Sequence, residues 1–520
     1  MPGLVDAGGM TTAAKSLRQS MARLHTWTGL VFGWVLYAMF LTGAVSYFRE
    51  EISQWMRPEV PALAQLPDAA GSAALAIASL QGLAPGASQW VIDLADERRN
   101  VVAASWRAGG GGVSDGRAML DPLSGKPLHA RETTGGEFFY YFHFSLHYLP
   151  RVAARWLVGL ATMFMLVAIV SGVITHKKIF TNFFTFRPGK GARSWLDAHN
   201  VLSVWVLPFH LLITYTGLVT LMTLYMPWGL DSAPDAAQAR PSLRAEMTAL
   251  MPPGTPRGTA APLPDVGAMV REAERRWGTG SVARLVVDHP GDAASRVKVV
   301  RSEASRVSVS PRYLAFEGPQ GALRQVKDHS GPAAETRGVL YGLHMARFAG
   351  TTVRWLYFIA SLAGAAMVAT GLVLWTVKRR AKRAEPEHAP IGRRLVERLN
   401  VAAIAGLPVA MAAFLWGNRL LPAELADRRG WEIHLFFAVW ALMLFHAGAR
   451  PVQRAWTEQF GAAAVLCAAL PLWNLCAGSR HLFASLREVD WVYAGMELAL
   501  LATAALLAAM AMKTVRRAGS

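Results

Sequence analysis

Long apolar segments dominate the pattern of this chain. Eight of them are roughly 20 residues long, which is about the length that an α-helix needs to cross a ~30 Å hydrocarbon core. They cover residues 26–48, 153–175, 200–225, 354–376, 399–420, 432–448, 457–477 and 490–512. This pattern predicts a polytopic membrane protein with about eight transmembrane helices and an all-α membrane part.

Two stretches between these segments, 49–140 and 226–340, follow a different pattern. Each has a short helical stretch, near 73–80 and 266–277, followed by strand-like runs and turns. The runs lie at 90–93, 101–106 and 118–126 in the first stretch, and at 283–288, 296–301 and 313–324 in the second. A helix followed by antiparallel strands predicts one small α+β domain in each stretch.

Basic residues collect at the ends of the apolar segments. The chain is 53% hydrophobic and 17% charged, with a formal net charge of +18. If there are eight spans, the basic residues of the N-terminus, of loops 176–193 and 378–383, and of the C-terminus all face one side, which the positive-inside rule makes cytoplasmic. Both termini are then cytoplasmic, the α+β stretches face outward, and the charge attracts anionic lipid rather than nucleic acid.

A repeated spacing of histidine and glycine indicates an internal duplication. His25 precedes Gly43 by 18 residues, and His199 precedes Gly217 by the same 18 residues. The expected organisation is a cytoplasmic N-terminus 1–24, a first repeat 25–180, a cytoplasmic loop 181–198, a second repeat 199–383, and an extra C-terminal four-helix membrane region 384–520. Both copies enter the membrane from the same side, so the expected pseudo-two-fold axis runs along the membrane normal.

A second histidine pair occupies equivalent positions at the outward ends of the repeats. His147 and His344 lie shortly before Arg-Trp pairs that begin with Arg155 and Arg354. Ionisable side chains near lipid are costly and tend to be functional, and neutral imidazole is the commonest metal ligand in proteins. Paired imidazoles at two depths therefore predict haem, with His25 and His199 at the inner edge and the second pair at the outer edge.

Two neighbours of the outer pair are further candidates. His143 lies four residues before His147, on the same face if this segment is helical, and is a substitute ligand or a partner near the haem edge. Arg155 and Arg354 suit haem propionates, because guanidinium binds carboxylate in bidentate fashion, and they suit lipid phosphate equally well.

Two other histidines break the symmetry of the repeats. His210 lies 11 residues after His199 and returns to nearly the same helical face, so the third segment would present imidazoles to two haems. His176 closes the second segment, where it either caps a helix C-terminus or replaces His25 as a ligand.

Several motifs resemble one known family over about residues 1–383. They are Leu24-His25-Thr26-Trp27-Thr28-Gly29-Leu30, the paired Thr-Gly segments, the turn Asp121-Pro122-Leu123-Ser124-Gly125, and Leu343-His344 before Arg354-Trp355. The chain in this respect resembles the PepSY-associated transmembrane helix proteins. The resemblance implies a bacterial inner-membrane ferric-siderophore reductase with two b-type haems and periplasmic PepSY-like domains.

The function expected from these features is transfer of electrons across the membrane to a ferric siderophore or another ferric chelate. No Rossmann fingerprint or flavin motif occurs, so the electron donor is a separate cytoplasmic protein or a membrane quinol. A haem-free PepSY scaffold that binds peptides or proteins, and a transporter, are the two alternatives. The last four segments, 398–513, would dock a quinone, brace a dimer or extend the bundle.

Overall fold

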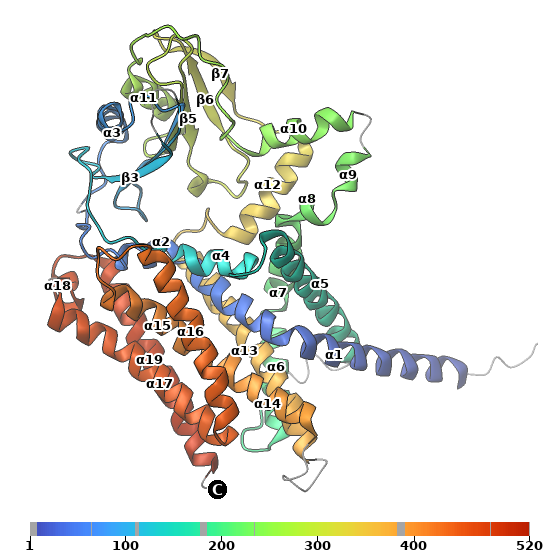
Figure 1. The fold of residues 1–520 in the computed structure, drawn as a ribbon. Coiled ribbons are helices and arrows are strands. Elements are labelled where there is room, and N and C mark those ends of the chain that lie inside the picture. The colour runs from blue at the N-terminus through green and yellow to red at the C-terminus, as the bar shows by residue number, and fades with distance from the viewer. Residues whose placement is uncertain are drawn as a thin grey trace, which may run out of the picture. The chain divides into compact units, whose positions relative to one another are not determined.

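The structure is a computed structural model that describes residues 8–63, 65–109, 114–176, 185–232, 235–381, 390–478 and 480–518. Residues 177–184 and 382–389, which hold part of the predicted basic loops, lie outside these ranges. The chain forms two compact units (Figure 1). Unit 1 comprises Met1–Met56, Glu132–Leu221 and Val353–Ser520, and unit 2 comprises Arg57–Arg131 and Met222–Thr352.

Unit 1 is helical. Its helices are α1 (Gly8–Ser46), α2 (Arg49–Trp55), α4 (Glu137–Ser145), α5 (Arg151–Thr175), α6 (Ala192–Trp205), α7 (Leu207–Thr220), α13 (Thr351–Ala381), α14 (Ile391–Ile404), α15 (Gly406–Leu420), α16 (Arg428–Ala449), α17 (Val452–Ala477), α18 (Leu482–Arg487) and α19 (Trp491–Ala518). Within the described residues, seven spans are long and apolar enough to cross a membrane, the consecutive helices α14 and α15 together forming one of them. Seven of the eight predicted spans are thereby confirmed. The bent pair α6 and α7 passes the same test when taken together, which gives up to eight spans.

The third predicted span is not one straight helix. Helices α6 and α7 meet at a bend of 68°, at Val206, and Pro208 lies in the first turn of α7. Proline has no amide N–H and disfavours helical geometry in the residue before it, so a helix readily ends there. Since α7 ends at Thr220, the third predicted span, 200–225, is corrected to a pair of helices with a bend between them.

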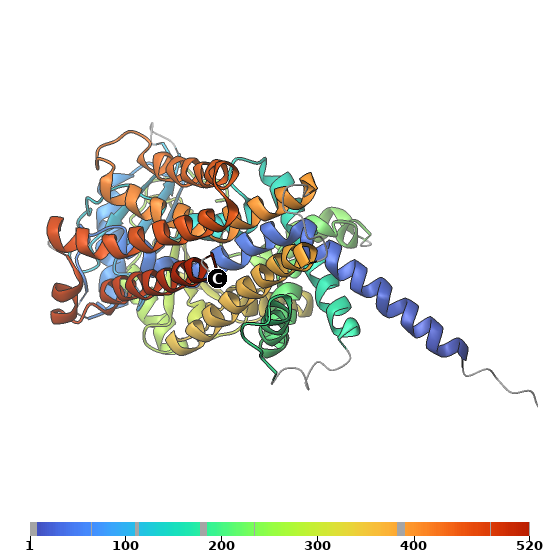
Figure 2. The same cartoon turned by 90° about the horizontal axis from the view of Figure 1, so that it is seen from below.

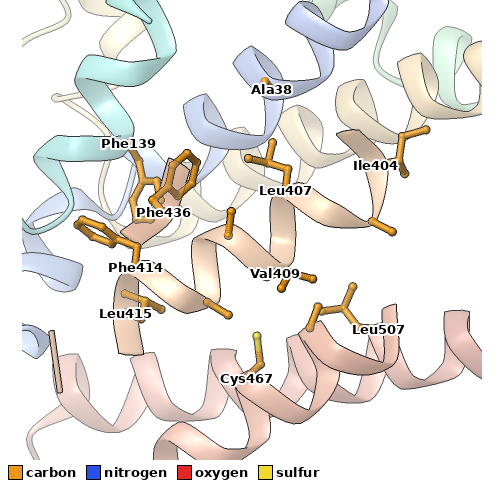
Figure 3. Close-up of a cluster of buried hydrophobic side chains, with 14 of the residues drawn as sticks. Ala38, Phe139, Ile404, Leu407, Val409, Phe414, Leu415, Phe436, Cys467 and Leu507 are labelled. Atoms are coloured by element: carbon orange, nitrogen blue, oxygen red, sulfur yellow. The ribbon is translucent and has the colours of Figure 1, made fainter. Parts of the chain in front are cut away.

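The C-terminal helices α14–α19 pack side by side in unit 1 (Figures 1 and 2). Their core combines alanines with a few large side chains, among them the fully buried Leu407, Phe414 and Phe436 (Figure 3). Lipid tails are as apolar as these side chains, so close packing through small residues, rather than escape from water, holds such helices together.

A helix break at Ala405 separates α14 from α15. Side chains of neighbouring helices compensate for it: the Tyr37 hydroxyl donates to the Ile404 carbonyl at 3.1 Å, and the Trp440 indole donates to the Ala402 carbonyl at 3.0 Å. Backbone groups freed inside a membrane need such internal partners, because no water replaces them.

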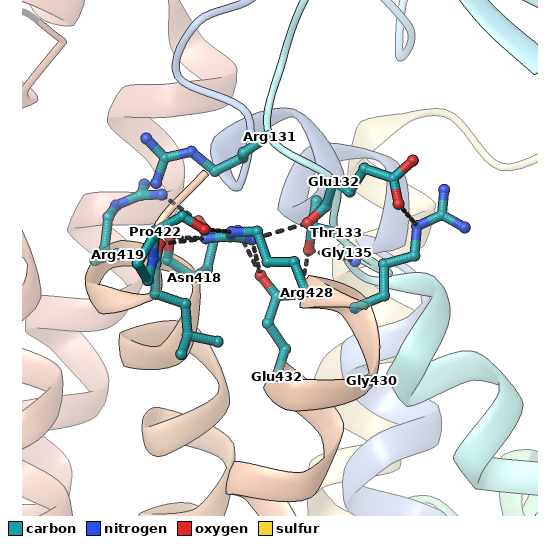
Figure 4. A network of polar contacts seen from close by, with 12 residues as sticks. Arg131, Glu132, Thr133, Gly135, Asn418, Arg419, Pro422, Arg428, Gly430 and Glu432 are labelled. Atoms are coloured by element: carbon teal, nitrogen blue, oxygen red, sulfur yellow. Dashed lines mark hydrogen bonds and ion pairs between the residues drawn. The ribbon is translucent and has the colours of Figure 1, made fainter. Parts of the chain in front are cut away.

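A buried ion pair fixes α16 to the segment that leads into α4. The Arg428 guanidinium donates to the Glu432 carboxylate at 2.6 Å and to the Glu132 carbonyl at 2.8 Å (Figure 4). Asn418 and Thr133 donate to the two oxygens of the same carboxylate at 2.9 and 2.6 Å. Both charged side chains are at most 1% exposed, and buried charges are tolerated when they are paired and hydrogen-bonded in this way.

Unit 2 contains one antiparallel sheet in the order β3-β2-β1-β4-β5-β6-β7. The strands are β1 (Gln89–Asp93), β2 (Val102–Arg107), β3 (Gly116–Leu120), β4 (Val282–Asp288), β5 (Arg296–Arg301), β6 (Tyr313–Glu317) and β7 (Ala322–Lys327). The helical elements of this unit are α3 (Ala69–Leu83), α8 (Met222–Tyr225), α9 (Trp228–Asp231), α10 (Ala236–Met247), α11 (Val266–Trp277), the 3-10 turn η1 (Glu303–Ser305) and α12 (Pro332–Met345).

This sheet joins the two stretches that the sequence predicts as separate domains. Strand β1 of the first stretch pairs antiparallel with β4 of the second, with Val91 opposite Val286. Helices α3 and α11 pack on one face of the sheet around Leu80, Val270 and Leu285. Alternation along each strand reveals which face is buried but not which strand lies alongside, so the predicted pair of domains is corrected to one layer of strands.

Candidate functional site

Two histidine rings meet between α1 and α6 in unit 1. The ring centroids of His25 and His199 are 6.0 Å apart, with an interplanar angle of 70°. The His25 Nδ1 lies 2.8 Å from the Ala168 carbonyl, and the His199 Nδ1 lies 2.8 Å from the Met367 carbonyl. A carbonyl only accepts hydrogen bonds, so Nδ1 carries the proton in each ring, and the Nε2 lone pair is left available to a metal.

Each of these rings lies against a glycine on the helix that supplies its carbonyl. A Cβ atom on Gly172 would lie 3.2 Å from the His25 Cε1, and one on Gly371 would lie 3.1 Å from the His199 Cε1. Each glycine is four residues after the carbonyl that the histidine contacts. The absence of a side chain therefore lets the imidazole reach the backbone one helical turn earlier.

His143 has the same kind of setting on α1. Its Nδ1 lies 2.7 Å from the Met39 carbonyl, and a Cβ on Gly43 would lie 2.8 Å from the His143 Cε1. Gly43 again lies four residues after the residue whose carbonyl accepts the hydrogen bond, Met39. Helix α4 ends at Ser145, so His143 and His147 do not share a continuous helical face.

His210 lies deep in α7 and is 1% exposed. Its ring contacts Phe40 at a centroid distance of 5.8 Å, and a Cβ on Gly364 would lie 3.2 Å from the His210 Nε2. This Nε2 is buried and has no hydrogen-bond partner. The bend between α6 and α7 corrects the prediction that His210 and His199 share one straight helical face.

The predicted outer pair belongs to two different units. His147 follows α4 and stacks on Phe437 of α16, with ring centroids 5.7 Å apart and an interplanar angle of 21°. Burial, and next the neighbouring His434, lowers the pKa of His147. His344 lies in the last turn of α12 in unit 2, so the pairing of these two histidines stays a prediction.

The remaining predicted residues all lie at helix ends. His176 is the C-cap of α5. Arg354 forms a 2.5 Å ion pair with Glu51 and is 9% exposed, so a carboxylate of the chain itself compensates its charge. Arg155 donates to the Ser145 hydroxyl at 3.3 Å and lies over the Phe144 ring.

Two contributors to the site carry little signal in the sequence. Asn400 of α14 accepts from the Trp34 indole at 2.9 Å and donates to the Leu372 carbonyl at 3.2 Å. It thereby connects the C-terminal helices to the helices that carry His25 and Gly371. The second contributor is Gly364, which lies against the His210 ring. The sequence does not mark it, because it is not part of the repeated Thr-Gly and Ser-Gly pairs.

The described residues contain no group of three or more His, Cys, Asp or Glu side chains that could hold one metal ion. Apolar helices with histidine rings held between them define a multi-pass membrane protein. A family model described as the PepSY-associated TM region matches residues 22–378, and the chain belongs to this family. It is also similar to an uncharacterized protein of Pseudomonas aeruginosa, with 28% identity over 302 residues, which cover 55% of this chain and 73% of that protein.

Proposed function

We propose that this protein is a dihaem b-type cytochrome of the bacterial inner membrane that passes electrons to a ferric siderophore or another ferric chelate in the periplasm. Fe(III) binds oxygen chelators more tightly than Fe(II) does, so reduction releases the iron for uptake. In this proposal both termini are cytoplasmic and unit 2 is periplasmic. The single observation that carries it is the arrangement of His25 and His199.

His25 and His199 would hold one haem between them, and the distance between their rings fits this role. Metal–imidazole bonds are about 2 Å long, so rings on opposite sides of one metal have centroids roughly 6 Å apart. The observed 6.0 Å agrees with this value. Both rings keep Nε2 free, because their Nδ1 atoms donate to carbonyls, the usual outer-shell arrangement of a metal-bound histidine.

A second haem would take its ligands from the remaining histidines. Burial, a carbonyl partner and a glycine contact make His143 the best-supported candidate. His210 follows, because a buried polar atom without a partner is rare in proteins. His147, His344 and His176 complete the set from which the second pair is drawn.

The chain's own residues would fix and tune these sites. Bound haem supplies one-electron transfer, and its potential responds to axial ligands, hydrogen bonds and burial. The carbonyls of Ala168 and Met367 hold the two imidazoles in one tautomer and orientation. The order of one helix followed by antiparallel strands in both halves of unit 2 supports the proposed duplication.

The haem-free scaffold and the transporter are distinguishable from this proposal. A scaffold predicts a colourless protein after expression with added haem. Proton-coupled transport needs a titratable carboxylate in the membrane, and Glu432, one of the two available in the C-terminal spans, is fully buried against Arg428. The deciding experiment is a reduced-minus-oxidised visible spectrum of purified protein, with alanine variants of His25 and His199.

A further inference from the structure

Two arginines lie directly opposite each other at one end of the sheet in unit 2. Arg301 is the last residue of β5, and Arg312 immediately precedes β6. The Arg301 amide donates to the Arg312 carbonyl at 2.9 Å. This contact extends the antiparallel register by one step beyond the pair Val300 and Tyr313. Directly opposite residues project from the same face, with Cβ atoms about 5 Å apart.

Two other arginines of this sheet lie opposite acids. Arg284 lies opposite Asp93 and contacts it at 2.6 Å. Arg296 lies opposite Glu317 and forms an ion pair with it. Among the described residues, no carboxylate pairs with Arg301 or Arg312. Like charges directly opposite each other are destabilising, so Arg301 and Arg312 place two mutually repelling charges at this end of the sheet.

Arg306 adds a third guanidinium to the same end. Its Nη1 donates to the Ser310 carbonyl at 3.3 Å, while its Nη2 lies 3.6 Å from the Glu335 carboxylate, too far for a hydrogen bond. This Nη2 and the Arg301 Nε are buried without hydrogen-bond partners. Burial, and then repulsion by Arg312, lowers the pKa of Arg306, while Glu335 opposes this shift and Arg301 adds a smaller lowering.

The loop that carries Arg306 is fixed in place. The Val309 amide donates to the Gly338 carbonyl at 3.2 Å, and the Ser310 hydroxyl donates to the Ala334 carbonyl at 3.0 Å. Both acceptors are on α12. The nearby Glu303 carboxylate is already paired with Arg347 at 2.7 Å. Contacts with α12 therefore fix the backbone of this loop, and Glu335, at 3.6 Å, is the one acid paired with these three arginines among the described residues.

We propose that Arg301, Arg306 and Arg312 form a binding site for the carboxylate groups of an anionic ferric chelate. Guanidinium groups recognise planar oxyanions in bidentate fashion, and buried donors gain most from such a partner. The identity of the iron complex rests on the proposed function, whereas oxyanion recognition rests on the arginines alone. Free phosphate shares this chemistry and is separated from a chelate by experiment.

The test measures binding of gallium(III) citrate, which is not reduced under these conditions, to the full-length protein in phosphatidylcholine nanodiscs. The test variant is Arg301→Gln/Arg312→Gln. The matched control, Arg296→Gln/Glu317→Gln, removes a neutral pair from the same two strands. We expect the test variant to weaken binding at least about tenfold, since truncated charge contacts of this kind cost that much or more. The control keeps the wild-type affinity.

Three results would overturn the inference. They are equal affinity of the test variant and the wild type, no binding by the wild type, and phosphate binding as tight as gallium citrate binding. The test variant should unfold at the wild-type temperature or above, because it loses only repulsion, so weaker binding cannot be ascribed to misfolding. Haem content is measured in the same samples. Gallium citrate binding without haem would contradict only the proposed function. Haem without gallium citrate binding would contradict only this inference.

Discussion

The imidazole of His25 lies 6.0 Å, centroid to centroid, from the imidazole of His199, although these residues belong to two helices, α1 and α6, that are far apart in the sequence. Each ring is oriented by a backbone carbonyl that lies 2.8 Å from its Nδ1. This carbonyl belongs to α5 for His25 and to α13 for His199. The contacts fix which nitrogen carries the proton before any ligand binds. The two rings are therefore oriented in advance, and their Nε2 atoms would hold the haem iron.

Removing either partner of this pair should remove the same haem. We expect His25→Ala, His199→Ala and the double variant each to bind about one haem per protein instead of about two, because one axial ligand does not retain haem b. Pyridine haemochrome analysis of purified protein measures the ratio. His329→Ala, an exposed position in unit 2, is the control and keeps both haems. Additive losses in the double variant would show that the two histidines serve different haems.

The glycine contacts give a second prediction. Gly172→Ala and Gly371→Ala each introduce a methyl group about 3 Å from an imidazole, which is closer than van der Waals contact, so the ring must shift. We expect altered low-spin haem spectra and a lower midpoint potential or haem content in both variants. Potentiometric titration monitored by visible absorption detects the change.

The control for these variants is Gly29→Ala. Gly29 lies on the same helix as His25, and an added Cβ has no neighbour within 4 Å. Alanine is also the better helix former, so the spectrum and the protein yield should match the wild type. An unchanged spectrum in Gly172→Ala would show that the contact between Gly172 and His25 does not affect haem binding.

Much of the fold follows from the sequence pattern. Helix α11 begins at Val266 and ends at Trp277, and strand β5 covers Arg296–Arg301, both as predicted. Apolar length alone identifies seven spans. The bend at Val206 is missed because the run of apolar residues continues across Pro208, and hydropathy does not register a missing N–H. The pairing of β1 with β4 is missed because strand neighbours are a tertiary property.

His143 and His147 should differ in their effects. His143 is buried, with its Nδ1 on the Met39 carbonyl, while His147 stacks on Phe437 beside the half-exposed Tyr148. We expect His143→Ala to lose one haem and His147→Ala to retain both, with only a small spectral shift. Haem content and low-temperature EPR of the two variants decide between them. Haem loss confined to His147→Ala would restore the symmetric outer pair.

The candidate site could be predicted only in part. The equal spacing from His25 to Gly43 and from His199 to Gly217 marks the two histidines that meet in the structure. The spacing does not reveal that Gly43 contacts His143 rather than His25, because glycines serve neighbours across helices. Asn400 lies outside the repeated region, so no internal comparison in the sequence draws attention to it.

The buried ion pair of α16 gives a prediction for stability. Glu432→Gln leaves the Arg428 charge uncompensated in a site at most 1% exposed, and breaking a buried pair costs about 3–5 kcal/mol. We expect a clear fall in the thermal unfolding temperature, which circular dichroism of the protein in detergent measures. The double variant Arg428→Met/Glu432→Gln should recover part of the lost unfolding temperature, because neither buried charge remains. A double variant less stable than Glu432→Gln alone would rule out this electrostatic explanation.

In the proposed function, His25 and His199 hold one of two b-type haems. The decisive measurement is the reduced-minus-oxidised spectrum and the haemochrome count of the full-length protein, expressed with haem supplied. We expect about two b-type haems per chain and the loss of about one in His199→Ala. A colourless wild-type protein, or an unchanged haem count in the variant, would contradict it.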